Sequence, residues 1–128
     1  MATASLLVVE DNREIRRSLR DLFMLEGFVV EEAGNGREAL ERLDAGAHPS
    51  MIVLDLMMPI MDGWEFLRHI RDRPERDPHV LVLTSMAYDA DTRGLRERYG
   101  VDVLDKATEV VRLLEIARGH RAEVGGRH

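Results

Sequence analysis

Five short apolar runs recur along the chain, and each is too short to form a stable helix of its own. Nearly continuous apolar runs are typical of strands buried on both faces, as in a parallel sheet covered by helices. The segments between them repeat apolar residues with helical spacing, as Ile15, Leu19 and Leu22 do. The sequence therefore predicts five strands that alternate with five helices in an α/β sandwich. The expected strands lie near residues 5–9, 28–30, 51–54, 80–83 and 101–104.

Polar residues and glycines mark the expected ends of the helices. Asn35 and Asp62 each precede a glutamate by three residues, the spacing at which a capping side chain and an acid satisfy unpaired backbone amides. Gly27 and Gly46 stand where the first and second helices should end. Asp11 fits the same capping pattern at the start of the first helix, so a purely structural role for Asp11 stays open.

The helix expected over residues 88–99 is the weakest of the five. Leu95 and Tyr99 are the large apolar groups within it, and Gly94 in its interior costs about 1 kcal/mol relative to alanine. The last residues, 121–128, show no helical period and contain two glycines. We therefore expect one domain over residues 1–120, followed by a C-terminal tail or linker stub over 121–128.

Composition narrows the classes of function. The 128 residues carry a net charge of −6, which opposes sequence-independent binding to phosphate backbones, so direct nucleic-acid binding is not expected. Cysteine is absent, which excludes disulfides and thiolate metal sites. No run is long enough to span a membrane, and the first residues lack the charge pattern of a signal peptide. A cytoplasmic location is the expectation.

The ligand site of an open α/β sheet lies beyond the carboxyl ends of its strands. Alone, each polar residue found there has an ordinary explanation as a cap, a turn residue or a solvated strand end. Together, three carboxylates at one edge repel one another and require a cation, whereas a hydroxyl and an ammonium suit an anion. Mg²⁺ is the natural cation, with Mn²⁺ as an alternative, and a phosphoryl group is the natural anion. The three carboxylates are those of Glu10, Asp11 and Asp55, and the other polar residues after the expected strands are Thr84, Ser85, Asp105 and Lys106.

A glycine-rich phosphate-binding loop is absent from the sequence, so the chain is not expected to cradle a nucleotide. A phosphoryl group held at this edge should therefore be bonded to a side chain. Asp55, at the end of the central strand, can act as a carboxylate nucleophile and form an acyl phosphate.

These residues stand in motifs that resemble the receiver domain of two-component response regulators, the CheY-like proteins. The similar stretches are LLVVEDN, VLDLMMPIMDG, VLVLTS and VLDK, and the likeness covers about residues 4–120. The resemblance implies a five-stranded parallel sheet of order 2-1-3-4-5 sandwiched by five helices. It also implies a signalling phosphoprotein of a phosphorelay rather than an enzyme, one that assists its own phosphorylation and dephosphorylation.

The resemblance further implies how a metal ion would be held. Asp11 and Asp55 would bind Mg²⁺ directly, and Glu10 would act mostly through water. The backbone carbonyl of Met57 would complete the protein ligands.

A second set of implied roles concerns the phosphoryl group and the partners. Asp55 would accept the group from a sensor histidine kinase or a phosphotransfer protein. Lys106 would pair with one phosphoryl oxygen, and Thr84 would hydrogen-bond another. Helix four, strand five and helix five would form the surface for a homodimer or an output partner.

Two positions depart from the family pattern. Ala107 follows Lys106 where the family usually has a proline after a cis bond, so either this bond is strained or Lys106 is presented differently. Val103 stands where an aromatic residue commonly turns inward, and Tyr88 and Tyr99 are the candidates to replace it. We therefore hypothesise that the aspartate is phosphorylated while the output through helix four, strand five and helix five is altered.

Three other functions are compatible with such a fold, because fold alone does not determine function. A phosphorylation-independent interaction module is favoured by Val103 and Ala107 and opposed by the intact acids, Thr84 and Lys106. A flavin-binding electron-transfer protein would need a loop rich in Ser, Thr and Gly after the first strand, where this chain is acidic. A Mg²⁺-dependent phosphatase would need a second acid where Met57 stands.

Overall fold

A computed structural model of the chain describes residues 4–73, 78–87 and 89–125. In this part of the chain, five parallel strands form a single sheet in the order β2-β1-β3-β4-β5. The predicted α/β fold and strand order are thereby confirmed, and two of the strands have the expected bounds. The strands are β1 (Ser5–Val9), β2 (Val29–Ala33), β3 (Met51–Leu54), β4 (His79–Thr84) and β5 (Asp102–Asp105).

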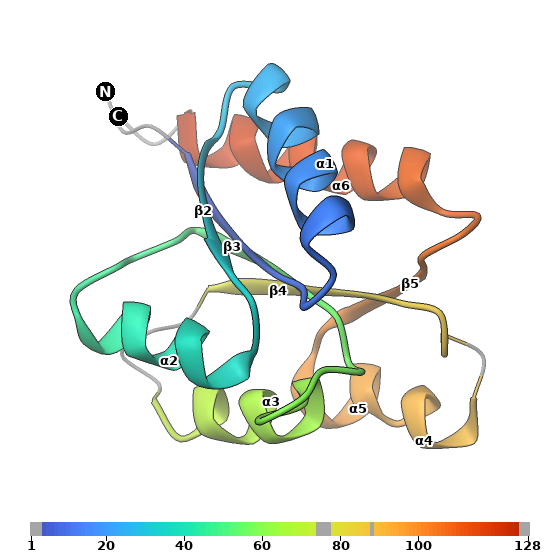
Figure 1. Ribbon diagram of the computed structural model, residues 1–128. Coiled ribbons are helices and arrows are strands. Elements are labelled where there is room, and N and C mark those ends of the chain that lie inside the picture. The colour runs from blue at the N-terminus through green and yellow to red at the C-terminus, as the bar shows by residue number, and fades with distance from the viewer. Residues whose placement is uncertain (1–3, 74–77, 88, 126–128) are drawn as a thin grey trace.

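Helices cover both faces of the sheet, as Figure 1 shows. One face carries α1 (Arg13–Leu25) and α6 (Val110–Gly125). Of the helices in the described residues, none is both long enough and apolar enough to cross a membrane. The other face carries α2 (Gly36–Asp44), α3 (Gly63–Arg71), α4 (Ala90–Arg93) and α5 (Leu95–Tyr99).

Two apolar layers hold the helices to the sheet, one on each face. Alternate residues of β1 point into opposite layers. Val8 packs in the layer that contains Phe23 of α1 and Leu113 of α6, and Leu7 packs in the layer that contains Phe66 of α3. Burial of each large apolar side chain contributes about 1.5–3 kcal/mol. The apolar runs of the sequence therefore became strands because both of their faces are covered.

The predicted helix ends at Asn35, Asp62, Gly27 and Gly46 are confirmed. Oδ1 of Asn35 and Oδ1 of Asp62 each accept the backbone N–H three residues on, at 2.9 Å, at the starts of α2 and α3. Gly27, with φ of 91°, and Gly46, with φ of 107°, follow α1 and α2 in the left-handed conformation that favours glycine.

The residue that caps α1 is not Asp11, the candidate from the sequence. Oδ1 of Asn12 accepts the backbone N–H of Ile15 at 3.0 Å, so Asn12 rather than Asp11 caps this helix. The Asp11 carboxylate is therefore not needed to satisfy the helix end.

The segment expected as one helix over 88–99 contains two short helices, α4 and α5, divided at Gly94. Glycine lowers helix stability, and four- and five-residue helices have little packing to offset it. At the other end of the chain, α6 continues to Gly125, so residues 121–125 of the expected tail are helical. Position 88 and residues 126–128 lie outside the described part.

Gly63, the first residue of α3, lies directly against the end of β3. A Cβ atom at this position would lie 2.6 Å from the Asp55 carbonyl oxygen and 2.8 Å from Cα of Leu56. Both are backbone atoms, so no side-chain rotation would relieve the overlap. The absence of a side chain at Gly63 therefore allows α3 to pack against the strand end that carries Asp55.

Gly63→Ala is expected to lower the free energy of unfolding by about 1–3 kcal/mol, because the added methyl group has no space. Gly119→Ala is the matched control, since a Cβ there meets nothing within 4 Å, and it should raise stability by up to about 1 kcal/mol. Urea denaturation of both variants measures the difference. Equal effects of the two substitutions would contradict this packing account.

Candidate functional site

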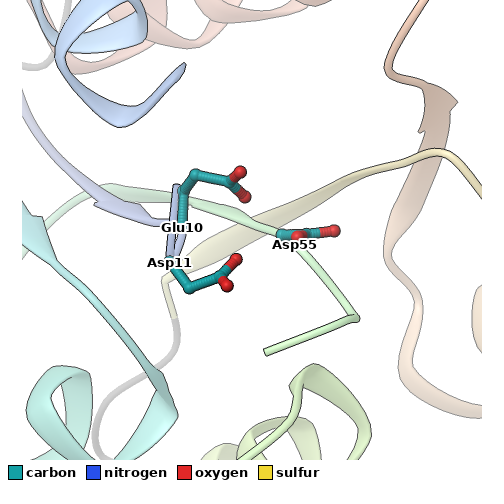
Figure 2. A group of neighbouring side chains, drawn as sticks. All are labelled: Glu10, Asp11 and Asp55. Carbon is teal, nitrogen blue, oxygen red and sulfur yellow. The ribbon is translucent and has the colours of Figure 1, made fainter. Parts of the chain in front are cut away.

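Three acids meet at the carboxyl edge of the sheet because β1 and β3 are neighbours in register. Val9 lies opposite Leu54, so the next residues, Glu10 and Asp55, leave the sheet side by side. One carboxylate oxygen from each of Glu10, Asp11 and Asp55 lies within 4.8 Å of the others, and Figure 2 shows the three side chains gathered there. Glu10 is 2% exposed and Asp55 is 7% exposed, whereas Asp11 is open to solvent. The predicted grouping of these acids is present.

Lys106 reaches the same place from the end of β5. Its Nζ donates to Oε1 of Glu10 at 2.8 Å and to Oδ2 of Asp55 at 3.4 Å. The described residues contain no cis peptide bond, so the bond between Lys106 and Ala107 is trans. The missing proline therefore does not prevent the ammonium group from contacting the acids.

Burial and charge act together on the pKa values of this group. Burial raises the pKa of Glu10 to about 7 against the opposing hydrogen bond from Lys106, and the nearby Asp55 carboxylate adds to the rise. Burial acts to lower the pKa of Lys106, but its contacts with Glu10 and Asp55 outweigh that effect and raise this pKa above its usual value. The lysine is therefore charged at neutral pH, and it contacts two of the three acids, Glu10 and Asp55.

An unsatisfied oxygen shows that the acids suit a cation. Oε2 of Glu10 is buried and has no hydrogen-bond partner in the part of the chain that the structure describes. A buried carboxylate oxygen without a partner is costly unless a donor, water or a metal ion satisfies it. Three converging carboxylates are hard oxygen ligands of the kind that Mg²⁺ and Mn²⁺ take. The residues present therefore fit a divalent cation.

The other polar residues of this edge are used differently. Thr84 is fully buried, and its Oγ1 accepts the backbone N–H of Met86 at 3.1 Å, which leaves the hydroxyl proton to donate. Oδ2 of Asp105 accepts from the backbone N and the Oγ1 of Thr108 at 3.0 and 2.7 Å. The Asp105 carboxylate thus stabilises the turn before α6 and does not join the three acids. Ser85 is exposed to solvent.

Two residues that shape the site carry no role in the sequence-based prediction. Nη1 of Arg16, in α1, donates to the backbone carbonyl of Glu10 at 2.9 Å. Gly63 permits the close approach of α3 to the Asp55 carbonyl. The place of Gly63 directly after the cap Asp62 was a usable signal. No local pattern marks Arg16, because its contact depends on how α1 lies against the strand ends.

A groove of about 240 Å³ opens beside Val103, on the face of α4 and β5. Val103 itself is buried. Tyr99 does not fill the groove, since its ring packs against the core and lies under the Arg71 guanidinium, 5.4 Å from the ring centroid. Tyr88 lies outside the described residues. The residues that line the groove are Ala87, Thr92, Arg93, Arg96, Val103 and Glu109.

Sequence comparison identifies relatives of the chain. The model of the response regulator receiver domain matches residues 6–118. Response regulator MprA of Mycolicibacterium vanbaalenii is 46% identical over 80 residues, which make up 62% of this chain and 34% of MprA. The chain therefore spans about a third of the length of this relative.

Solved structures of response regulators share the fold. The response regulator protein TrrA of Thermotoga maritima, solved in complex with Mg²⁺–BeF, has a TM-score of 0.78 and 28% identity, over 91% of this chain and 98% of TrrA. The chemotaxis protein CheY4 of Vibrio cholerae has a TM-score of 0.80 and 28% identity, over 92% of this chain and 98% of CheY4. Since the family pattern covers most of the chain, and the acids and the lysine of that pattern meet at one sheet edge, the chain belongs to the receiver domain family of two-component response regulators.

Proposed function

We propose that this receiver domain is a phosphorylatable switch whose acceptor is Asp55. The proposal rests on the position of the Asp55 carboxylate, which is buried beside two further acids and the Lys106 ammonium at the ligand-binding edge of the sheet. The donor is a phosphohistidine of a sensor histidine kinase or of a phosphotransfer protein. A carboxylate oxygen of Asp55 attacks the phosphorus, the histidine N–P bond breaks, and the histidine nitrogen keeps the electron pair.

Lys106 and Thr84 are assigned to the oxygens of the transferred group. In phosphoryl transfer the protein mainly positions groups and neutralises charge on these oxygens. Nζ of Lys106 lies 3.4 Å from Oδ2 of Asp55, and this contact supports the pairing of the ammonium with an oxygen of a phosphoryl group on Asp55. Thr84 keeps its hydroxyl proton for a second oxygen.

The metal ligands in this proposal are Asp11, Asp55 and Glu10, with the backbone carbonyl of Met57 as a further one. Their fit to a divalent cation is supported by the converging oxygens and by the unsatisfied Oε2 of Glu10. When bound, Mg²⁺ or Mn²⁺ would supply positive charge to the phosphoryl oxygens. TrrA, a relative of the same fold, was solved with Mg²⁺–BeF, which supports the choice of ion.

The switch acts through protein contacts rather than as a member of a known enzyme family. We assign the output or homodimer surface to α4, β5 and α6, the helix predicted as the fifth, where Arg93 and Arg96 border the groove beside Val103. The match to MprA covers only about a third of that protein. An output domain linked to this receiver domain is therefore proposed and not observed. We place the switch in the cytoplasm and, from the net charge of −6, assign it no direct contact with nucleic acid.

A phosphorylation-independent interaction module is the second candidate, and Val103 is the observation that favours it. This residue supplies no aromatic ring beside the groove that could report on the state of Asp55.

Incubation with acetyl phosphate and Mg²⁺ is expected to add one phosphoryl group to the protein, as measured by intact-mass spectrometry. The gain should be absent without Mg²⁺ and absent in Asp55→Asn, which lacks the nucleophile. Asp62→Asn is the matched control. It removes a carboxylate at the start of α3, which packs against the end of β3, and the amide oxygen of asparagine can still accept the capping hydrogen bond. No gain by folded wild-type protein would contradict the switch and favour the phosphorylation-independent module.

The raised pKa of Glu10 predicts how stability depends on pH in metal-free protein. Because the pKa is about 7 in the folded state and 4.5 in the reference state, folding favours the protonated form. This contribution to stability is fully present below pH 4.5 and is lost as the pH rises through 7. Relative to Glu10→Gln, the wild type should therefore lose stability between pH 5 and pH 8 in urea denaturation. Parallel pH profiles would show that Glu10 is not held protonated by burial.

Val103 predicts a weak conformational response. With a phosphoryl analogue bound, amide exchange in α4 and α5 should change little in the wild type, because Val103 has no ring that can move between two positions. Val103→Tyr supplies a ring beside the groove and should enlarge the change. A wild-type response as large as that of receiver domains with an aromatic residue would contradict this prediction.

A further inference from the structure

On the basis of the proposed metal site, we infer that Arg16 is a positioning residue. It holds the backbone at Glu10 and Asp11, the two acids that follow β1. Nη1 of Arg16 donates to the backbone carbonyl of Glu10 at 2.9 Å, and Nε of the same guanidinium donates to Oε1 of Glu32 at 3.2 Å. The second oxygen of Glu32 accepts from Nη1 of Arg20 at 3.2 Å. A continuous tether therefore runs from the site backbone through α1 to the edge strand β2.

The tether acts on the peptide unit that orients Asp11. The Glu10 carbonyl and the Asp11 amide belong to the same rigid peptide plane, which also contains the Asp11 Cα, so holding the carbonyl restrains the point from which the Asp11 side chain starts. Asp11 is exposed, and in the described residues no hydrogen bond from another side chain is found to hold its carboxylate. Its approach to the other two acids therefore depends on its backbone.

Burial and pairing distinguish this contact from an ordinary surface ion pair. The side chains of Arg16 and Glu32 are 18% and 26% exposed, so both groups are held where solvent screens them less. Arg16 is also fixed at its own backbone, whose N–H donates to the carbonyl of the cap Asn12 at 2.9 Å. Arg16 is therefore held at its backbone by the helix and at its guanidinium by Glu32 and the Glu10 carbonyl.

The pairing with Glu32 also determines what Arg16 does electrostatically. A guanidinium that paired with the three carboxylates would compete with a metal ion for them. Arg16 pairs with Glu32, which it shares with Arg20, and in the described residues no ion pair joins Arg16 to the three acids, so Arg16 holds the carbonyl of Glu10 without serving as a counter-ion for them. Arg16 thus contributes geometry to the site rather than charge.

The test is the Mg²⁺ affinity of Arg16→Gln, measured by calorimetric titration at pH 8, with Arg17→Gln as the matched control. Arg17 is the exposed neighbour on the same helix, and the substitution removes the same charge. Loss of a positive charge alone would strengthen Mg²⁺ binding. A positioning role predicts the opposite result, which is weaker Mg²⁺ binding. We expect Arg16→Gln to weaken Mg²⁺ binding about 10-fold, in line with the loss of a residue that orients metal ligands, and Arg17→Gln not to weaken it.

Two further variants separate positioning from a general loss of structure. Arg16→Lys should recover part of the affinity, since an ammonium can still donate to the Glu10 carbonyl but lacks the separate nitrogens with which the guanidinium bridges that carbonyl and Glu32. Glu32→Gln should weaken binding more than Glu31→Gln, which removes the same charge from the exposed neighbour on β2. In metal-free Arg16→Gln, the exchange of the Glu10 amide, which donates to the Ala33 carbonyl, should rise, and in Arg17→Gln it should not.

Equal or stronger Mg²⁺ binding by Arg16→Gln than by Arg17→Gln would overturn this inference and leave the proposed function intact. Absence of Mg²⁺ binding by the wild type itself would overturn the proposed metal site and this inference with it. If Arg16→Gln fails to fold, the comparison of Glu32→Gln with Glu31→Gln decides, and equal affinities there would overturn the inference.

Discussion

The parallel pairing of β1 with β3 is the constraint on which the site depends. This pairing brings the two strand ends to the same level, so Glu10 and Asp55 leave the sheet beside each other. The backbone N–H of Asp55 still belongs to the ladder, since it donates to the carbonyl of Val9 at 3.0 Å. The backbone of Asp55 is therefore fixed by the sheet itself, and its side chain lies at the strand end beside Glu10.

A site held this firmly places like charges close together at a cost in stability. Burial and the Asp55 carboxylate both raise the pKa of Glu10, and a single ammonium, that of Lys106, contacts the acids. Such an arrangement is retained where the charge serves a function, because the apolar layers on both faces supply stability that the site itself does not. This cost in stability is greatest at Oε2 of Glu10, which is buried without a hydrogen-bond partner in the described residues. A cation bound beside this oxygen would lower the cost.

How far the sequence predicts the structure depends on how local each determinant is. The bounds of β1 and β3 follow from apolar runs buried on both faces, and the caps Asn35 and Asp62 follow from hydrogen bonds that span three residues. The grouping of the three acids also follows, because parallel strands end at one edge. The division of the fourth helix at Gly94 could not be predicted, since propensity and tertiary packing compete there. The roles of Asp105 and Arg16 were hidden because side-chain direction depends on the finished fold.

The two sides of the domain differ in how strongly their elements are held, and this bears on how a change at Asp55 would travel. On the β1 side, α1 is long, capped by Asn12 and tied to β2 through Arg16. On the β4 side, α4 and α5 have four and five residues, and neither has a side-chain cap. Helices this short are marginal on their own. The backbone N–H of Met86 donates to the Thr84 hydroxyl, and the chain then leads into α4. In the proposed switch, a shift of Thr84 would act first on the backbone that leads into α4. Because Val103 supplies no aromatic ring, that backbone would be the proposed route from Thr84 to the groove.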